Sequence, residues 1–293
     1  MKGAGSSLFR TVFGRSFQNP VLLAAGTAGF GRELAGVMDL DRLGGLVTKA
    51  VSREPRRGNR PPRVAEFRGG MLNSVGLANP GMTAVRDDHL PWLASHLRRA
   101  QVLVNVVGFT VEEYAEVVSG LDGVPGMAGF ELNLSCPNTS AGGIEFGADA
   151  DCVRSIVSLC RKRTRLPLIA KLSPVLPDIA GMALVARDAG ADGITVVNTL
   201  PGLLHAEDGA ERLGNGYGGV SGPALLPIGV LAVSRVVERT DGMPVIGVGG
   251  VRTVEDVRQY LRVGAALVAI GTAALADPRL PERIVRGLER SSG

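Results

Sequence analysis

Short runs of β-branched and aliphatic residues recur along the whole chain, separated by segments whose apolar residues repeat with a helical period. The runs that predict strands are residues 21–25, 45–49, 102–107, 129–134, 168–172, 193–198, 245–248 and 266–270. The clearest helical segments between them are residues 111–119, 151–163, 178–189, 226–239 and 254–263. Strict alternation of strand and helix requires a parallel sheet, and eight such units predict a closed (β/α)8 barrel. An open, doubly wound sheet is the alternative.

Two of the predicted connections are too long to be simple turns. Residues 51–82 follow the second strand and residues 200–223 follow the sixth, so both lie at the carboxyl ends of the strands. Barrel enzymes build their active sites at that end, and loops of this length are usually functional. The 293 residues fit one domain, with residues 1–18 as a plug or hairpin beneath the barrel.

Composition narrows the class of protein. The three cysteines, Cys136, Cys152 and Cys160, form no CxxC pair, which favours a reducing, cytoplasmic compartment and excludes an iron–sulfur cluster or structural zinc bound by this chain alone. No run of about 18 apolar residues predicts a membrane span. Residues 1–16 lack the apolar core of a signal peptide.

The chain is basic, with a net charge of +4, and much of the excess lies in residues 53–63. This segment is rich in Pro and Arg but has no aromatic residue on which a base could stack, so nucleic-acid binding is not expected. A solvated loop is the favoured interpretation. Attraction of a small anion is the alternative.

The segment Glu131-Leu-Asn-Leu-Ser-Cys-Pro-Asn138 is the most informative in the chain. Alternation places Leu132 and Leu134 on one face of the strand and Asn133 on the other, and the Cys-Pro step ends strand pairing. Cys136 therefore lies at the carboxyl end of a strand. A lone cysteine there would be ordinary packing, as we expect for Cys152 and Cys160, but the flanking amides of Asn133 and Asn138 favour a functional thiol.

Polar residues end most of the other predicted strands too, and they include Lys49, Asn105, Lys171, Asn198 and Thr199. The last two strands end instead in glycine, at Gly249-Gly250 and Gly271-Thr272. Together with the segment from Gly219 to Gly222, these turns predict a phosphate cradle. His89, His96 and His205 belong to no metal-binding motif.

These motifs resemble those of class 1 dihydroorotate dehydrogenases. The resemblance runs from Asn19 to Pro278 and is carried by NSVGLANPG from Asn73, ELNLSCPN from Glu131, KLSP from Lys171, VNTL from Val197, GVSGP from Gly219, IGVGGV from Ile246 and IGT from Ile270. Cys136 stands where the class 2 enzymes carry serine. Residues 138–143 and 56–63 resemble the class 1B, NAD-linked catalytic subunit more than the fumarate-using class 1A enzyme. Residues 201–217 depart from the family pattern, and Ala25 and Ala50 stand where the family often has hydroxylated residues.

The resemblance implies a TIM barrel that binds FMN and oxidises (S)-dihydroorotate to orotate in pyrimidine biosynthesis. The cofactor-binding residues that it implies are Ala25, Lys49, Ala50, Asn105, Asn133, Lys171, Val197, Ser221, Gly222, Gly249, Gly250, Gly271 and Thr272. The substrate-binding residues are Lys49, Asn73, Ser74, Val75, Gly76, Leu77, Asn133, Asn138, Asn198 and Thr199. Cys136 is the implied general base, and residues 137–146 are a candidate lid.

The resemblance also implies a homodimer inside a heterotetramer, whose second subunit carries FAD and a 2Fe-2S cluster and passes electrons to NAD⁺. Class 1A chemistry with fumarate and a dihydropyrimidine dehydrogenase-like flavoenzyme are the redox alternatives. A phosphate-binding barrel isomerase or synthase would share the glycine-rich turns without needing a flavin. A non-catalytic binding subunit is a further alternative.

Overall fold

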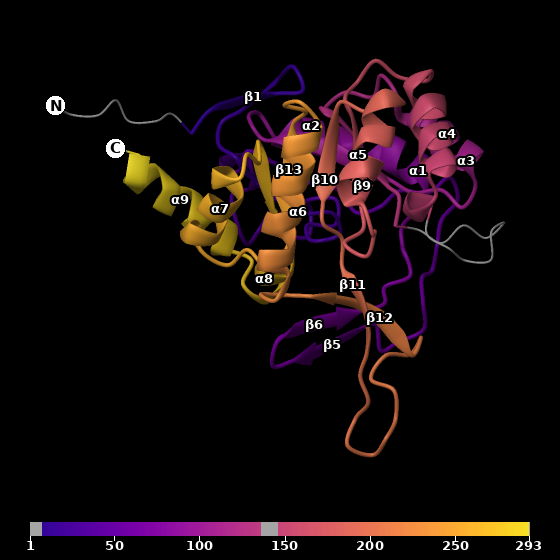
Figure 1. Cartoon of the computed structure of the whole chain (residues 1–293), viewed down its shortest axis with the longest axis vertical. Coiled ribbons are helices and arrows are strands. Elements are labelled where there is room, and N and C mark those ends of the chain that lie inside the picture. Colours follow the sequence, from indigo (N-terminus) through magenta and orange to yellow (C-terminus); the bar gives the residue numbers. More distant parts are fainter. Residues whose placement is uncertain (1–7, 136–145, 293) are drawn as a thin grey trace.

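The computed structural model describes residues 8–135 and 146–292. Its centre is a closed barrel of eight parallel strands in the order β10-β13-β14-β3-β4-β7-β8-β9 (Figure 1). These strands are β3 (Val21–Leu23), β4 (Gly45–Val47), β7 (Gln101–Val106), β8 (Gly129–Asn133), β9 (Leu168–Leu172), β10 (Gly193–Val196), β13 (Val245–Val248) and β14 (Leu267–Ile270). The predicted TIM barrel is confirmed, and the open-sheet alternative is wrong. Several strands end one or two residues earlier than predicted, because the residues that follow them turn into the carboxyl-end loops.

Helices surround the barrel, and the long ones are α3 (Val111–Leu121), α4 (Ala150–Arg161), α5 (Ile179–Asp188), α6 (Leu225–Arg239), α7 (Val254–Arg262) and α9 (Leu280–Ser292). Among them, α3, α4, α5 and α7 begin at side-chain caps. Thr110 caps α3, and Thr253 forms a reciprocal capping box with Asp256 at the start of α7, as the sequence predicts. The shorter elements are η1 (Leu40–Arg42), α1 (Met82–Ala84), η2 (Val85–His89), α2 (Leu90–His96), η4 (Phe146–Ala148) and α8 (Thr272–Ala276). No described helix is long and apolar enough to cross a bilayer.

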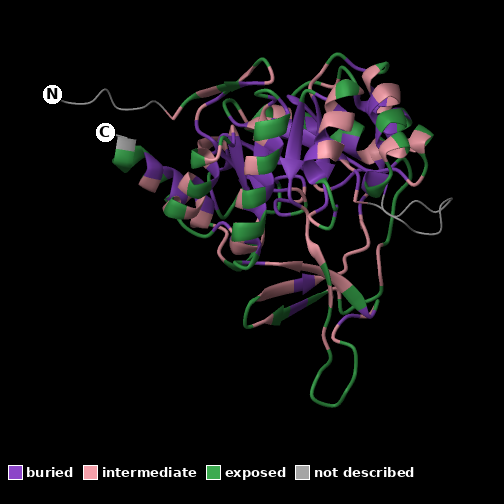
Figure 2. Cartoon of the chain, viewed as in Figure 1, coloured by how far each residue is buried: buried purple, intermediate pink, exposed green. Residues whose placement is uncertain are grey.

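Alternation along the barrel strands creates two cores, and Figure 2 shows the buried strands (purple) behind helices that are partly exposed (pink and green). Outward residues such as Leu23 and Leu132 pack against the helices, whereas inward residues such as Leu22 and Ile169 fill the lumen. The N-terminal hairpin of β1 (Arg10–Val12) and β2 (Arg15–Phe17) belongs to the lumen core, because Phe17 is fully buried among those inward residues.

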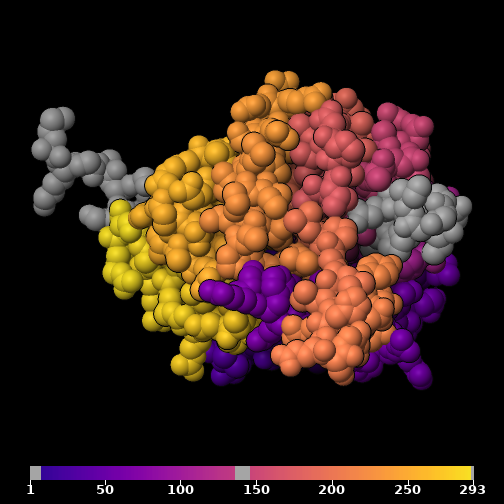
Figure 3. Space-filling model, turned by 60° about the horizontal axis from the view of Figure 1, so that its bottom comes forward, coloured from indigo at the N-terminus to yellow at the C-terminus, as the bar shows by residue number. Residues whose placement is uncertain are grey.

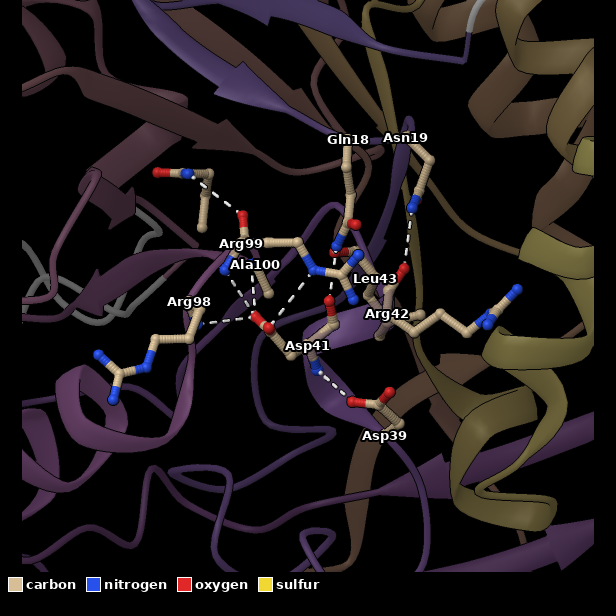
Figure 4. Close-up of polar contacts among 10 residues, drawn as sticks. Gln18, Asn19, Asp39, Asp41, Arg42, Leu43, Arg98, Arg99 and Ala100 are labelled. Carbon is tan, nitrogen blue, oxygen red and sulfur yellow. Dashed lines mark hydrogen bonds and ion pairs between the residues drawn. The ribbon is translucent and has the colours of Figure 1, made fainter.

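Asp41 ties the amino-terminal end of the barrel together (Figure 4). Its Oδ1 accepts the backbone N–H groups of Arg98, Arg99 and Ala100 at 2.9, 2.7 and 2.9 Å. Gln18 donates to the backbone carbonyl oxygens of Asp41 and Leu43, both at 2.6 Å. Burial alone would raise the pKa of Asp41, but the three donated N–H groups outweigh it and hold that pKa below its ordinary value.

The two long connections pair with each other in a four-stranded antiparallel sheet, which we call the cap sheet. It consists of β11 (Leu200–Leu203), β12 (Tyr217–Ser221), β6 (Gly70–Asn73) and β5 (Val64–Phe67), in that order. Ala65 and Leu72 pack with Leu213 in a small core of their own. The cap sheet lies beyond the carboxyl ends of the barrel strands, and Figure 3, turned toward that end, shows the first connection (purple) beside the second (orange). The sequence predicts functional loops here but not their pairing.

Candidate active site

Four adjacent barrel strands present polar side chains to the lumen near their carboxyl ends. Asn105 of β7 lies opposite Glu131 of β8, and Lys171 of β9 lies opposite both Asn133 of β8 and Thr195 of β10. We call these five residues the polar wall. On the other half of the barrel, the inward residues of β13, β14, β3 and β4 are apolar, and they include Val248, Ala269, Ala24 and Val47. The lumen therefore has one polar side and one apolar side at the end where barrel enzymes bind their ligands.

Glu131 lies at the centre of the polar wall and is almost fully buried. Its Oε1 accepts a hydrogen bond from Asn105 Nδ2 at 2.7 Å and lies 3.7 Å from the ammonium of Lys171. Its Oε2 accepts a hydrogen bond from the Thr195 hydroxyl at 2.8 Å. Both oxygens thus have partners, as a buried carboxylate requires. Glu131 is not predicted as a site residue from the sequence. The available signal is that Glu131 and Asn133 are two residues apart, so that their side chains lie on the same face of the strand.

Three buried polar atoms at this end of the barrel have no hydrogen-bond partner in the described part of the chain. They are Asn105 Oδ1, Ser135 Oγ and Ser173 Oγ. Ser173 follows β9 directly, and Ser135 lies two residues after the end of β8. Because buried polar atoms in folded proteins are almost always hydrogen-bonded, these three point to a ligand that supplies the missing partners.

Two of the predicted substrate amides meet at the end of the polar wall. Asn198 Nδ2 donates to Asn133 Oδ1 at 3.4 Å, and the Thr199 N–H donates to Asn198 Oδ1 at 2.8 Å. The carbonyl oxygen of Asn133 accepts a hydrogen bond from the Tyr114 hydroxyl at 2.6 Å, which fixes the strand end. Val197, also predicted for the site, is buried beside them.

The predicted substrate loop from Asn73 to Leu77 has a fixed backbone. Gly76 and Leu77 have φ angles of +71° and +58°, a region that a leucine seldom occupies. Asn79 stabilises this turn, because its Nδ2 donates to the carbonyl oxygen of Leu77 at 2.8 Å and to Ser52 Oγ at 2.9 Å. The loop is thereby anchored to the residues that follow β4.

The same loop is connected to the second insertion and to the basic segment. Asn73 Nδ2 donates to the Gly219 carbonyl oxygen at 3.2 Å across the cap sheet. Asn59 donates from its side chain to Ser74 Oγ at 2.7 Å and from its backbone to the Val75 carbonyl oxygen at 3.1 Å. The basic segment 53–63 therefore borders the candidate site.

Lys49 follows β4 at the same end of the barrel and is partly exposed. Within residues 8–135 and 146–292, no carboxylate oxygen lies within 4.0 Å of its ammonium, whereas Lys171 is paired with Glu131. Lys49 is thus a cation available to an anionic ligand. Ala50 beside it is buried, and Ala25 at the end of β3 packs at the edge of the lumen core.

The glycine-rich turns lie close together, as the sequence predicts. Gly222, Gly249 and Gly250 have φ angles of +132°, +121° and +75°, and a Cβ at Gly250 would lie 2.4 Å from the backbone nitrogen of Leu226. Only glycine fits this close backbone approach. The Thr272 hydroxyl donates to Ser221 Oγ at 2.7 Å, which joins the end of β12 to the turn after β14. At Gly271 the nearest atom to an added Cβ is Ala24 Cβ at 3.7 Å, which is an ordinary van der Waals contact, so this turn is less crowded than the turn at Gly250.

Two predicted site residues, Cys136 and Asn138, lie outside the described residues, as do residues 137–145 of the predicted lid. On either side of this gap, Leu134 and Phe146 are buried, and the Gly147 N–H donates to the Leu134 carbonyl oxygen at 2.8 Å. Cys152 and Cys160 lie on α4 and pack in the outer core, as expected. Burial raises the pKa of the Cys160 thiol to about 12.

Other features of the described residues do not compete with this site. They contain no cluster of His, Cys, Asp and Glu that could hold a metal ion. A groove of about 780 Å³ lies on the outside of the barrel between α9 and residues 35–41, lined in part by Trp92, His96 and Arg283. It shares no residue with the polar wall or the glycine-rich turns, so we assign the chemistry to the carboxyl ends of the strands.

Comparison with known proteins agrees with this assignment. The dihydroorotate dehydrogenase family model matches residues 7–291. The chain is 45% identical over 280 residues to a dihydroorotate dehydrogenase B (NAD(+)) catalytic subunit from Desulforudis audaxviator, covering 95% of this chain and 90% of that one. It is 43% identical to the protein of the same name from Geobacillus kaustophilus, covering 94% and 87%. A Solibacter usitatus protein that carries the provisional name dihydroorotate dehydrogenase A (fumarate) is 45% identical over 96% of this chain and 92% of its own.

Proposed function

The chain belongs to the dihydroorotate dehydrogenase family, and from this we propose that it oxidises (S)-dihydroorotate to orotate with FMN as its cofactor. The observation that carries the proposal is the polar wall, at the same end of the barrel as the glycine-rich turns, with buried polar atoms in it and beside it that lack partners within the described residues. A phosphate-binding isomerase would need the turns alone. A flavin also needs a surface for its ring.

The residues at this end fit the three chemical parts of FMN. Its phosphate would bind at Ser221, Gly222, Gly249, Gly250, Gly271 and Thr272, where backbone groups approach closely. The pyrimidine part of the ring, which carries N–H and carbonyl groups, suits Asn105, Asn133 and Lys171. The apolar part suits the half of the lumen lined by residues such as Val47 and Ala24.

The substrate has a planar ring with amides and one carboxylate. Asn73, Asn133, Asn138 and Asn198 each offer a donor and an acceptor that match the amide edge of such a ring. The backbone of Val75, Gly76 and Leu77, with Ser74 and Thr199, would complete this surface. Lys49, which has no carboxylate partner in the described part of the chain, would receive the substrate carboxylate.

Oxidation removes a proton from C5 of dihydroorotate and a hydride from C6. Cys136 is the proposed base, because a thiol with a pKa of ~8.5 is easily deprotonated and a nearby cation favours the thiolate. FMN, when bound, supplies the hydride acceptor that no amino-acid side chain can provide. The asparagines hold the ring in place during both transfers, and the cap sheet would limit the access of water.

We further propose that the electrons leave for NAD⁺ through a second subunit that carries FAD and a 2Fe-2S cluster. Support comes from the relatives named as NAD(+)-linked catalytic subunits and from residues 138–143 and 56–63. A homodimer within a heterotetramer is the corresponding assembly. Fumarate use is the alternative, favoured by the Solibacter relative's name. A single domain over residues 1–293 and a cytoplasmic location stay predictions.

Anaerobic titration of the purified protein tests the proposed function. We expect a yellow protein with one FMN per chain and a flavin absorbance band at about 450 nm that bleaches with dihydroorotate. A colourless protein that cannot be reconstituted with FMN would favour the non-redox barrel enzyme. A flavin that bleaches with dihydrouracil but not with dihydroorotate would favour the dihydropyrimidine dehydrogenase-like alternative.

A further inference from the structure

Glu131 is buried in the barrel lumen, yet no step proposed above uses it. A buried carboxylate lowers stability unless its charge and hydrogen-bonding capacity are matched. Here the matching groups include Asn105 and Lys171, two of the residues proposed to contact the flavin ring. The carboxylate is therefore connected to the cofactor site through its partners.

The contact with Asn105 fixes which end of that amide faces the ligand. An ionised carboxylate only accepts hydrogen bonds, so the NH₂ group of Asn105 must be the end directed at Glu131 Oε1, 2.7 Å away. The carbonyl oxygen Oδ1 is then turned away from Glu131, and it is the buried atom left without a partner in the described residues. Glu131 thus makes Asn105 an acceptor for an N–H group of a ligand.

The contact with Lys171 restrains a flexible cation. The ammonium lies 3.7 Å from the same carboxylate oxygen, and the lysine side chain is only 9% exposed. Thr195 donates to the other oxygen, Oε2, at 2.8 Å, so the carboxylate is itself held in place from the neighbouring strand. Lysine has three donors, and Glu131 engages one side of the ammonium, which leaves the remaining donors for a ligand.

We propose that Glu131 is a positioning residue of the flavin site, which orients Asn105 as an acceptor and holds the Lys171 ammonium toward the polar edge of the flavin ring. The inference rests on the proposed function. Glu131 touches neither substrate nor cofactor in this scheme. It acts through its two partners.

Sulfite binding to the oxidised holoprotein gives a readout independent of turnover. Sulfite adds to a flavin and leaves negative charge on the ring, so its affinity reports a nearby fixed cation. We expect Glu131→Gln to weaken sulfite binding about tenfold, the scale of one charge-assisted contact, because Lys171 is released. If Glu131 acted only through its charge, removing that charge would leave more net positive charge and tighten binding. Unchanged or tighter binding in Glu131→Gln overturns the proposal.

Glu131→Asp is the second variant, and it keeps the charge while withdrawing the carboxylate by one methylene. Positioning predicts weaker sulfite and FMN binding in this variant too, and wild-type affinities would overturn it. Glu282→Gln is the matched control, because Glu282 is a largely buried carboxylate in an ion pair with Arg286 on α9. Glu282→Gln should alter thermal stability but should change neither the sulfite affinity nor the FMN affinity. If the wild type itself lacks FMN or does not react with dihydroorotate, the proposed function is wrong. If the wild type binds FMN and reacts, but the Glu131 variants have wild-type sulfite and FMN affinities, only the positioning role of Glu131 is wrong.

Discussion

The two thiols that the structure describes, Cys152 and Cys160, lie in the outer core. Cys160 is fully buried on α4, and burial raises its pKa to about 12, so it is inert as a base near neutral pH. Cys152 packs at the edge of the same core. Cys136 is the thiol proposed to remove the C5 proton.

We predict that Cys136→Ala retains FMN but slows the reduction of the flavin by dihydroorotate about 10²–10⁴-fold, the usual contribution of a positioned base. Stopped-flow absorbance in a single turnover measures this rate. Cys136→Ser should also be impaired at neutral pH, because a hydroxyl is a far weaker base. Cys152→Ala is the control and should react at the wild-type rate. An alanine variant at position 136 within about threefold of wild type would refute the assignment.

Asp41 gives a prediction about stability and pH. The pKa of its carboxyl is lowered in the folded protein, so it stabilises the fold at pH values above its unfolded pKa of ~3.9, and this contribution is lost as the pH falls through the folded value. Asp41→Asn should lower the free energy of unfolding by about 1–3 kcal/mol at pH 7, and the difference from wild type should shrink near pH 3. Urea unfolding at both pH values measures it. Asp87→Asn is the control, because Asp87 is exposed and, within the described residues, forms its ion pair with the adjacent Arg86. A deficit in Asp41→Asn that stays constant across pH would contradict the role of the Asp41 charge.

At the scale of elements, α7 supports the turn after β13. Tyr260 of α7 is buried, and its hydroxyl donates to the carbonyl oxygen of Gly249 at 2.8 Å. Its ring occupies the space beneath Gly247 and Gly229, where an added Cβ would lie 2.3 and 2.0 Å from Tyr260 atoms. Helix α7 therefore fixes the position of the proposed phosphate-binding turn through Tyr260.

We predict that Tyr260→Phe weakens FMN binding about five- to tenfold, since one hydrogen bond to the turn is lost and the Gly249 carbonyl oxygen loses that partner. Fluorescence titration of the apoprotein with FMN measures the affinity. Tyr217→Phe is the matched control, because Tyr217 is an exposed tyrosine of the cap sheet. Equal FMN affinities in wild type and Tyr260→Phe would show that the turn does not depend on the helix.

The barrel could be predicted from the sequence because each of its strands is a short run of β-branched and aliphatic residues. Residues 168–172 and 245–248 were predicted with their observed bounds, and the polar residues at the ends of β7 to β10 are the basis of the candidate site. The strands of the cap sheet escaped prediction because β11 contains Pro201 and Gly202, which are weak strand formers, and because β6 finds its partner β12 far along the chain. Glu131 was not predicted because its role depends on Thr195 and Lys171, which lie on other strands. The sequence of one strand does not show which side chains of the neighbouring strands will hydrogen-bond to it.

At the scale of the whole molecule, the chain provides one half of the proposed electron path. It contains three cysteines and no G-x-G-x-x-G motif opening a βαβ unit, so we infer that it has no iron–sulfur cluster or dinucleotide-binding unit of its own. We predict that the purified chain reduces its FMN with dihydroorotate but reduces NAD⁺ slowly until the proposed FAD and iron–sulfur subunit is added.

Steady-state formation of NADH, with and without that subunit, measures the effect. Anaerobic bleaching of the flavin in the same preparation is the control, because it shows that the first half-reaction is intact. Fast NAD⁺ reduction by the single chain would refute the two-subunit scheme. Rapid turnover with fumarate would instead place the protein in the class 1A branch.

The cap sheet joins segments made at very different times during synthesis. Asn73 pairs with Gly219, 146 residues later, whereas the polar wall is complete once Thr195 of β10 has been made. During synthesis, the β5–β6 hairpin therefore lacks its neighbouring strand until β12 has been made, so the cap sheet can be completed only after all segments of the polar wall are present. The cap sheet has a small core of its own, formed by Ala65, Leu72 and Leu213, and elements with few buried apolar contacts open at a low free energy. In native-state hydrogen exchange, the amides of β6 and β12 should accordingly exchange before those of the barrel strands that they cover.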